Sequence, residues 1–136
     1  RQAADIAQAT EFIDAMQDGF NSYLSQEATN ISGGQKQRIS IARAIVKRPE
    51  IYIFDDSFSA LDFRTDANLR AALKPITRNS TVFIVAQRVS TVMNADRIIV
   101  LDNGNMVGLG THKELLNTCE VYREIVTSQL SEEELA

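Results

Sequence analysis

Two adjacent carboxylates, Asp55 and Asp56, close the short apolar run at residues 51–54, and a third acid, Asp62, follows nearby. Carboxylate oxygens bind Mg²⁺ well, and a positioned carboxylate can also orient an attacking water. The three acids therefore fit a magnesium-dependent reaction at a phosphate group. Successive strand residues point to opposite faces of a sheet, so Asp55 and Asp56 should not hold one ion jointly unless the strand has already ended.

A second candidate segment is Ser32-Gly33-Gly34-Gln35, at the start of a predicted helix. Ser32 and Gln35 have the spacing of a capping box. The amides and the positive dipole end of a helix start attract anions, and glycines let the backbone approach a phosphate closely. A plain capped helix after a flexible turn has the same pattern, so this segment alone fits both interpretations.

The elements that position these residues follow from apolar patterns. The continuous apolar run at residues 51–54 predicts a strand buried on both faces of a parallel sheet, and residues 81–86 predict a second buried strand. Asn103-Gly104 predicts a hairpin turn. Helices are expected near residues 12–16, 32–48, 64–73, after 90 and from 111 to 129, and Thr111 with Glu114 has the spacing of a second capping box at the start of the last of these. Strands are expected at 51–54, 81–86, 97–101 and 105–109. This alternation predicts an α/β fold, with a mainly parallel sheet, flanking helices and one hairpin at the sheet edge.

Composition narrows the class of protein. The 136 residues have a formal net charge of −4 and 44% hydrophobic residues, which suits one core and argues against a nucleic-acid surface. No apolar run approaches the roughly 18 residues of a membrane span. The chain begins at Arg1, so we expect a segment of a longer protein. Its one cysteine, Cys119, cannot form an internal disulfide, which fits a reducing compartment.

The order of four motifs resembles the C-terminal part of the nucleotide-binding domain of ATP-binding cassette (ABC) transporters. The motifs are Ile-Ser-Gly-Gly-Gln at 31–35, Ile-Tyr-Ile-Phe-Asp-Asp at 51–56, Ser-Ala-Leu-Asp at 59–62 and Val-Ala-Gln-Arg at 85–88. The resemblance covers essentially the whole chain. It implies a partial P-loop NTPase fold, with the helical and signature region at about 1–48 and the Walker B, D-loop, switch-loop and C-terminal region at about 49–136.

The resemblance also implies roles for particular residues, with ATP and Mg²⁺ as cofactors. The signature residues would contact the γ-phosphate of an ATP held mainly by an opposing domain, the Walker B aspartate would hold Mg²⁺ through water, and the D-loop would cross between the two domains. The residues at these positions are Ser32, Gly33, Gly34 and Gln35 (signature), Asp55 (Walker B), and Ser59 and Asp62 (D-loop).

Two positions depart from the family's pattern. Asp56 stands where the family usually has a glutamate that polarises the attacking water, and Gln87 stands where it usually has a histidine. Shortening a side chain by one methylene moves the carboxylate, and a misplacement of about 1 Å can cost on the order of 10²-fold in rate. Glutamine still donates a hydrogen bond but cannot become cationic. We therefore expect the chain to resemble the degenerate-site subunit of a heterodimeric exporter. The only histidine, His112, is expected to have a structural or solvent-facing role.

One expected motif is missing. The chain contains no phosphate-cradling Gly-x-x-x-x-Gly-Lys-[Ser/Thr] loop, the Walker A motif. Alone, it is expected neither to bind ATP tightly nor to hydrolyse it. The sheet neighbours of residues 51–54 are also expected to be missing, and the exposed apolar surface would favour self-association.

Further similarities favour exporters within the family. No proline follows the acid pair, and the stretches at 95–101 and 110–116 are similar to exporter domains. Residues 25–28 lack the Gly-Glu-Arg-Gly pattern typical of exporters, which leaves the coupling to membrane helices open. The resemblance implies transmembrane domains and a second nucleotide-binding domain as partners, no nucleic acid, and a full-length protein at the cytoplasmic face of the cell membrane. The segment itself is expected to be soluble.

Two alternatives stay open at this stage. One is a soluble ABC-type ATPase that acts on nucleic acid or ribosomes, which the acidic balance and the exporter-like Gly-Thr-His-Lys-Glu-Leu-Leu segment disfavour. The other is an unrelated phosphoryl chemistry, with Mg²⁺ held by Asp55, Asp56 and Asp62. Membrane spans upstream in the full gene would decide the first.

Overall fold

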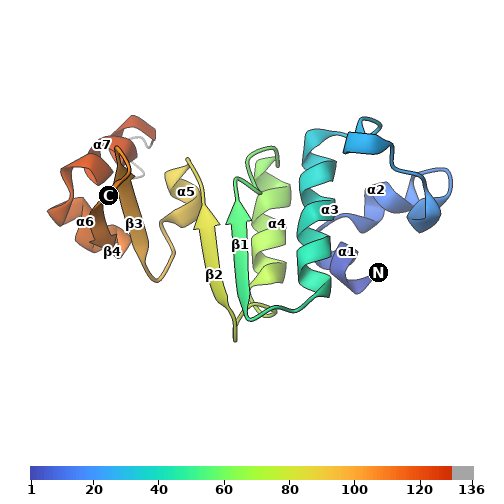
Figure 1. Cartoon of the computed structure of the whole chain (residues 1–136), viewed down its shortest axis with the longest axis horizontal. Coiled ribbons are helices and arrows are strands. Elements are labelled where there is room, and N and C mark those ends of the chain that lie inside the picture. Colours follow the sequence, from blue (N-terminus) through green and yellow to red (C-terminus); the bar gives the residue numbers. More distant parts are fainter. Residues whose placement is uncertain (130–136) are drawn as a thin grey trace. The chain divides into compact units, whose positions relative to one another are not determined.

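The computed structural model describes residues 1–129 and divides into two compact units, Arg1–Val85 and the part from Ala86 onward (Figure 1). No helix in this described range is both long and apolar enough to cross a membrane. The expected division near residue 48 separates motifs and not compact units, and it stays a prediction.

The first unit places helices against one face of a small parallel sheet. Strand β1 (Ile51–Asp55) pairs with β2 (Thr81–Val85) in parallel, from Ile51 opposite Thr81 to Asp55 opposite Val85. The helices are α1 (Gln2–Ile6), α2 (Thr10–Asp14), α3 (Gly33–Val46) and α4 (Phe63–Leu73), with short 3₁₀ turns at Gly19–Asn21 and Gln26–Ala28. The core joins α1, α3, β1 and α4, and its largest fully buried side chains are Ile41 and Leu69.

The burial of β1 differs from the sequence prediction. Tyr52 and Phe54 are buried, but Ile51 and Ile53 are 56% and 70% exposed, so the strand is covered on one face only. Strand β2 was also predicted to be buried, yet Phe83 is 50% exposed. Both predictions were wrong for a physical reason: the core helices pack on one face of the sheet, and no described element covers the other.

The local signals around α3 were correct. The Ser32 hydroxyl accepts a hydrogen bond from the Gln35 amide at 3.2 Å, and the Gln35 side chain accepts one from the Ser32 amide at 2.8 Å. The predicted capping box is therefore confirmed. Ile41 and Ile45 form the buried face, whereas Val46, in the last turn, is 71% exposed.

The second unit is a hairpin covered by helices. Strand β3 (Ile98–Asp102) pairs antiparallel with β4 (Asn105–Gly110) around the predicted Asn103-Gly104 turn, where both residues have positive φ. Helices α5 (Val89–Val92), α6 (His112–Thr118) and α7 (Glu120–Gln129) complete the unit. The capping box at Thr111 and Glu114 is confirmed. Within the described residues the hairpin is a sheet of its own and not the edge of a longer one, because β3 pairs only with β4.

Candidate functional site

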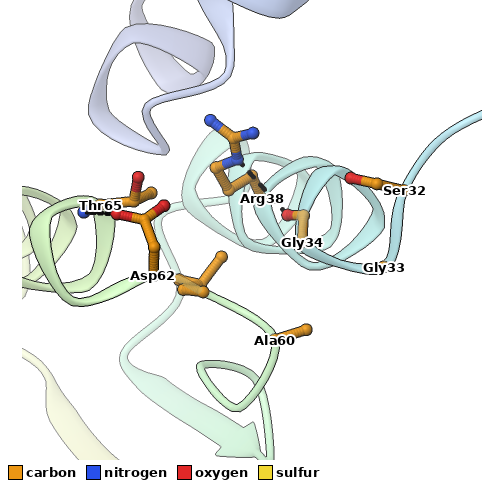
Figure 2. Close-up of a pocket in the computed structure, with 8 residues that line it drawn as sticks. Ser32, Gly33, Gly34, Arg38, Ala60, Asp62 and Thr65 are labelled. Carbon is orange, nitrogen blue, oxygen red and sulfur yellow. Dashed lines mark hydrogen bonds between the residues drawn. The ribbon is translucent and has the colours of Figure 1, made fainter.

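The start of α3 and the turn before α4 line a pocket of about 380 Å³ in the first unit. Figure 2 shows Ser32, Gly33, Gly34 and Arg38 on α3, opposite Ala60 and Asp62 of the turn. The lining residues are Ser32, Gly33, Gly34, Arg38, Ala60, Leu61, Asp62 and Thr65. The structure therefore brings together residues 32–34 and 60–62, which the sequence analysis singled out as parts of two separate motifs.

The helix start has the features of an anion site. The first amides of an α-helix have no acceptor within the helix, and the capping box accounts for those of Ser32 and Gln35. The amides of Gly33 and Gly34 are the next ones an anion would meet, at the positive end of the dipole of a 14-residue helix. Ser32 and Gly33 are exposed, and Gly34 and Gln35 are half-buried.

The two glycines have different surroundings. A Cβ on Gly34 would lie 2.8 Å from the carbonyl oxygen of Ala60, which is closer than real contacts allow. A Cβ on Gly33 would lie 3.7 Å from the Cβ of Ala60, an ordinary contact. Gly34 is thus required for α3 to pack on the turn, whereas Gly33 is free to serve a ligand.

Asp62 caps α4. Its carboxylate accepts a hydrogen bond from the amide of Thr65 at 2.9 Å. Hydrogen bonding by Thr65, through its side chain and then its backbone, holds the pKa of the Asp62 carboxyl below the ordinary value of 3.8. The charge of Asp62 therefore persists at neutral pH and stabilises the start of α4.

The acid pair lies at the end of β1. Asp55 is the last residue of the strand, and Asp56 follows with a φ of 47° and donates its amide to the Val85 carbonyl at 3.0 Å. The strand has ended at Asp56, so the strict alternation of faces does not apply to the pair. The Ser59 hydroxyl donates toward the Asp56 carboxylate at 3.1 Å. Among residues 1–129, no group of three acid, histidine or cysteine side chains could hold a metal ion.

Gln37 is a site residue that the sequence analysis missed. Its side-chain amide donates to the Asp56 carbonyl and the Ser59 hydroxyl and accepts from the Ala60 amide, each at 3.0 Å. These bonds join α3 to the turn between β1 and α4. The bonded residues are 19 to 23 positions away in the chain, so no local pattern signals them.

The second unit contains Gln87, which is exposed and follows the end of β2. Its carbonyl accepts a hydrogen bond at 2.8 Å from the side chain of Gln129, which also accepts one at 2.8 Å from the Val89 amide. The sequence analysis did not anticipate that Gln129, on α7, would hold this loop. His112 lies 2.8 Å, Nδ1 to Oη, from Tyr122, so it makes a structural contact; burial raises the pKa of the Tyr122 hydroxyl.

Comparisons with known proteins agree on one family. The ABC transporter family matches residues 1–59. An ABC transporter ATP-binding protein of Mycobacterium tuberculosis, itself uncharacterized, is 46% identical over 128 residues, which are 94% of this chain and 22% of that protein. The ATP-dependent lipid A-core flippase of Hahella chejuensis is 41% identical over 97% of this chain and 23% of its own length. An alpha-hemolysin translocation ATP-binding protein of Escherichia coli O157:H7 is 47% identical over 85% of this chain and 16% of its own.

A solved structure agrees with the sequence relatives. A bacterial Atm1-family ABC exporter with ATP bound matches 96% of this chain and 23% of its own length, with a TM-score of 0.90 and 35% identity. The chain thus spans about a fifth of the length of these proteins. The high TM-score confirms the predicted mixed α/β ABC ATPase fold.

Proposed function

Because this chain corresponds to part of an ABC transporter ATP-binding domain and is homologous to ABC exporters, we propose that it helps to power transmembrane export by ATP hydrolysis. The names of its relatives support this class, since they include a lipid A-core flippase and a hemolysin translocation protein. The partners we propose are transmembrane domains and a second ATP-binding domain, at the cytoplasmic face of the membrane.

The residues present fit the two cofactors. Ser32 and the amides of Gly33 and Gly34 would hold a phosphate of ATP, and Gln35 secures the helix start by capping. The exposed Asp55 carboxylate, at the end of a strand, would hold Mg²⁺. When bound, Mg²⁺ neutralises phosphate charge. The proposed division assigns the signature segment to about 1–48 and the other motifs to about 49–136.

We propose that the two ATP sites of the dimer are unequal. Residues 32–35 keep the sequence of an intact signature loop. Asp56, in contrast, is one methylene shorter than the glutamate that the family usually has there, and Gln87 cannot become cationic as the usual histidine can. The site on this chain would hydrolyse ATP slowly. Residues 32–35 would complete the site of a partner that has the usual glutamate and histidine. This arrangement requires a heterodimer.

One observation carries the proposal. The capped start of α3 and the D-loop turn line one pocket, and Gly34 and Gln37 fix their contact. Random loss of function would not be expected to preserve this contact between α3 and the turn while it replaces the usual catalytic residues at positions 56 and 87. Asp56 itself is held by the Ser59 hydroxyl, so its shorter side chain is part of an ordered turn.

The test compares substitutions in the full-length protein reconstituted with its partner. Gly34→Asp should remove most ATP turnover, but it also clashes with Ala60 within this chain. Gly33→Asp avoids that clash, and its negative charge favours the helix start while it repels phosphate. We expect Gly33→Asp to remove most turnover at an unchanged unfolding temperature, and Asp56→Asn to have a much smaller effect. The opposite ranking would contradict the proposal.

The chain alone is proposed to be inactive because it has no Walker A loop. The 136-residue chain should show no ATP hydrolysis above a buffer blank and no saturable ATP binding at micromolar concentration by isothermal titration calorimetry. Saturable binding in that range would contradict this part of the proposal.

A further inference from the structure

Gln37 connects the two segments that line the pocket. Its side-chain nitrogen, Nε2, donates to the Asp56 carbonyl oxygen and to Ser59 Oγ, and its oxygen, Oε1, accepts from the Ala60 amide. All three donor-to-acceptor distances are 3.0 Å, which is ordinary for strong N–H···O bonds. One side chain thus bonds to three residues of the turn, Asp56, Ser59 and Ala60.

The hydrogen-bond partners of Gln37 fix the orientation of its side-chain amide. The Ala60 amide can only donate, and the Asp56 carbonyl can only accept, so Oε1 must face the first and Nε2 the second. A primary amide has two donors and one acceptor oxygen, which is the set used here. Neither an apolar side chain of similar length nor an ionised carboxylate can supply that set.

Gln37 also reaches the Asp56 carboxylate indirectly. Ser59 Oγ accepts from Gln37 Nε2 and lies 3.1 Å from Asp56 Oδ2, toward which its hydroxyl donates. The same hydroxyl is 3.1 Å from the Asp56 carbonyl oxygen. Gln37 therefore holds the backbone of Asp56 directly and its carboxylate through Ser59.

The same glutamine lies in the first turns of α3, two positions after Gln35. A Cβ on Gly34 would lie 2.8 Å from the Ala60 carbonyl oxygen, and Gln37 accepts a hydrogen bond from the Ala60 amide, so α3 packs against both backbone polar groups of one residue of the turn. We propose that Gln37 is a positioning residue, which fixes residues 32–35 relative to the carboxylate of Asp56. This inference rests on the proposed function. In that function, residues 32–35 contact the nucleotide of the partner domain, and Asp56 belongs to the site for the nucleotide of this chain.

The experiment uses the full-length protein reconstituted with its partner, and it measures kcat and KM for ATP. Gln37→Met keeps the length and removes all three hydrogen bonds, and we expect kcat to fall on the order of 10-fold or more, with KM changed less. Arg43→Met is the matched control, since it introduces the same side chain at an exposed position of α3. It should keep the wild-type kcat.

Gln37→Glu distinguishes a positioning role from a purely structural one, because the measured quantity is the pH dependence of kcat relative to wild type. A neutral carboxyl group can donate one hydrogen bond, whereas the ionised form cannot and would face the Asp56 carbonyl and, across Ser59, the Asp56 carboxylate. We expect kcat relative to wild type to fall as pH rises and the new group ionises. Gln37→Met should show a pH-independent ratio. Unfolding temperatures of all variants are measured at each pH.

The outcomes separate this inference from the proposed function. If Gly33→Asp in the same assay leaves turnover unchanged, the proposed function fails. If Gly33→Asp removes turnover while both Gln37 variants match wild type, only the positioning role is overturned. It is also overturned if kcat follows the unfolding temperature and the Gln37→Glu ratio does not change with pH.

Discussion

Gly33 and Gly34 are adjacent at the start of α3, but only one of them is confined by the fold. An added Cβ would meet the Ala60 carbonyl oxygen at 2.8 Å from Gly34 and the Ala60 Cβ at 3.7 Å from Gly33. Backbone oxygen cannot move aside as the end of a flexible side chain can. The structural role of Gly34 and the proposed ligand-binding role of Gly33 can therefore be separated by experiment.

We predict that Gly34→Ala destabilises the chain and that Gly33→Ala does not. Overpacking against a fixed backbone atom costs roughly 1–3 kcal/mol, whereas alanine at the Gly33 position gains helix propensity. The free energy of unfolding of each variant, from urea titration, checks this. Equal values for the two variants would show that the contact of Gly34 with Ala60 is not tight.

The charge of Asp62 gives a pH-dependent stability. Because the folded-state pKa of its carboxyl is lowered, its stabilisation is complete above the ordinary pKa of 3.8 and is lost as pH falls through the folded pKa. Asp62→Asn retains a capping side chain but cannot titrate. We predict that the free energy of unfolding of wild type, relative to Asp62→Asn, declines only below about pH 4. A constant difference down to pH 2 would contradict the assignment.

At the level of elements, α7 holds the loop that contains Gln87. The Gln129 side chain accepts from the Val89 amide and donates to the Gln87 carbonyl, so one amide group spans the loop. Without it, the loop would exchange these two bonds for water.

We therefore predict that Gln129→Met exposes the Val89 amide to solvent exchange. Two lost hydrogen bonds of about 0.5–1.5 kcal/mol each should speed exchange of that amide by roughly 10-fold or more. Glu124→Met, at an exposed position of the same helix, is the control. Hydrogen exchange measured by NMR reports both variants, and protection of Val89 unchanged by Gln129→Met would refute the role of Gln129.

The elements that the sequence predicted well have local causes. The two capping boxes and the Asn103-Gly104 turn depend on residues within a few positions, so their types and spacing suffice. The links through Gln37 and Gln129 span up to 23 and 42 residues, and such side-chain bonds have no sequence signature. Burial of β1 was mispredicted because a continuous apolar run does not specify which elements cover each face.

For the whole molecule, the uncovered sheet face has a direct consequence. Ile53 and Phe83 lie opposite each other in the register of β1 and β2, and they are 70% and 50% exposed. Paired apolar side chains on an open face form a continuous surface, and such surfaces favour association. This is the surface that the predicted self-association of the chain would use.

We predict that the 136-residue chain self-associates and that Ile53→Lys reduces the association. A charge in the centre of the apolar face must be desolvated when two copies meet. Tyr23→Lys is the control, because Tyr23 is 82% exposed outside the sheet. Light scattering over a range of concentrations gives the mass of each variant. A monomeric wild-type chain at high concentration would contradict the prediction.

The central claim is that the site on this chain is impaired by Asp56 and Gln87. The most direct test replaces both residues with those usual in the family, Asp56→Glu with Gln87→His, in the full-length polypeptide without a partner. We predict that ATP turnover rises on the order of 10²-fold, because the carboxylate regains about 1 Å of reach and the second position regains an imidazole. A wild-type polypeptide that already hydrolyses ATP as fast as the double variant would contradict the account.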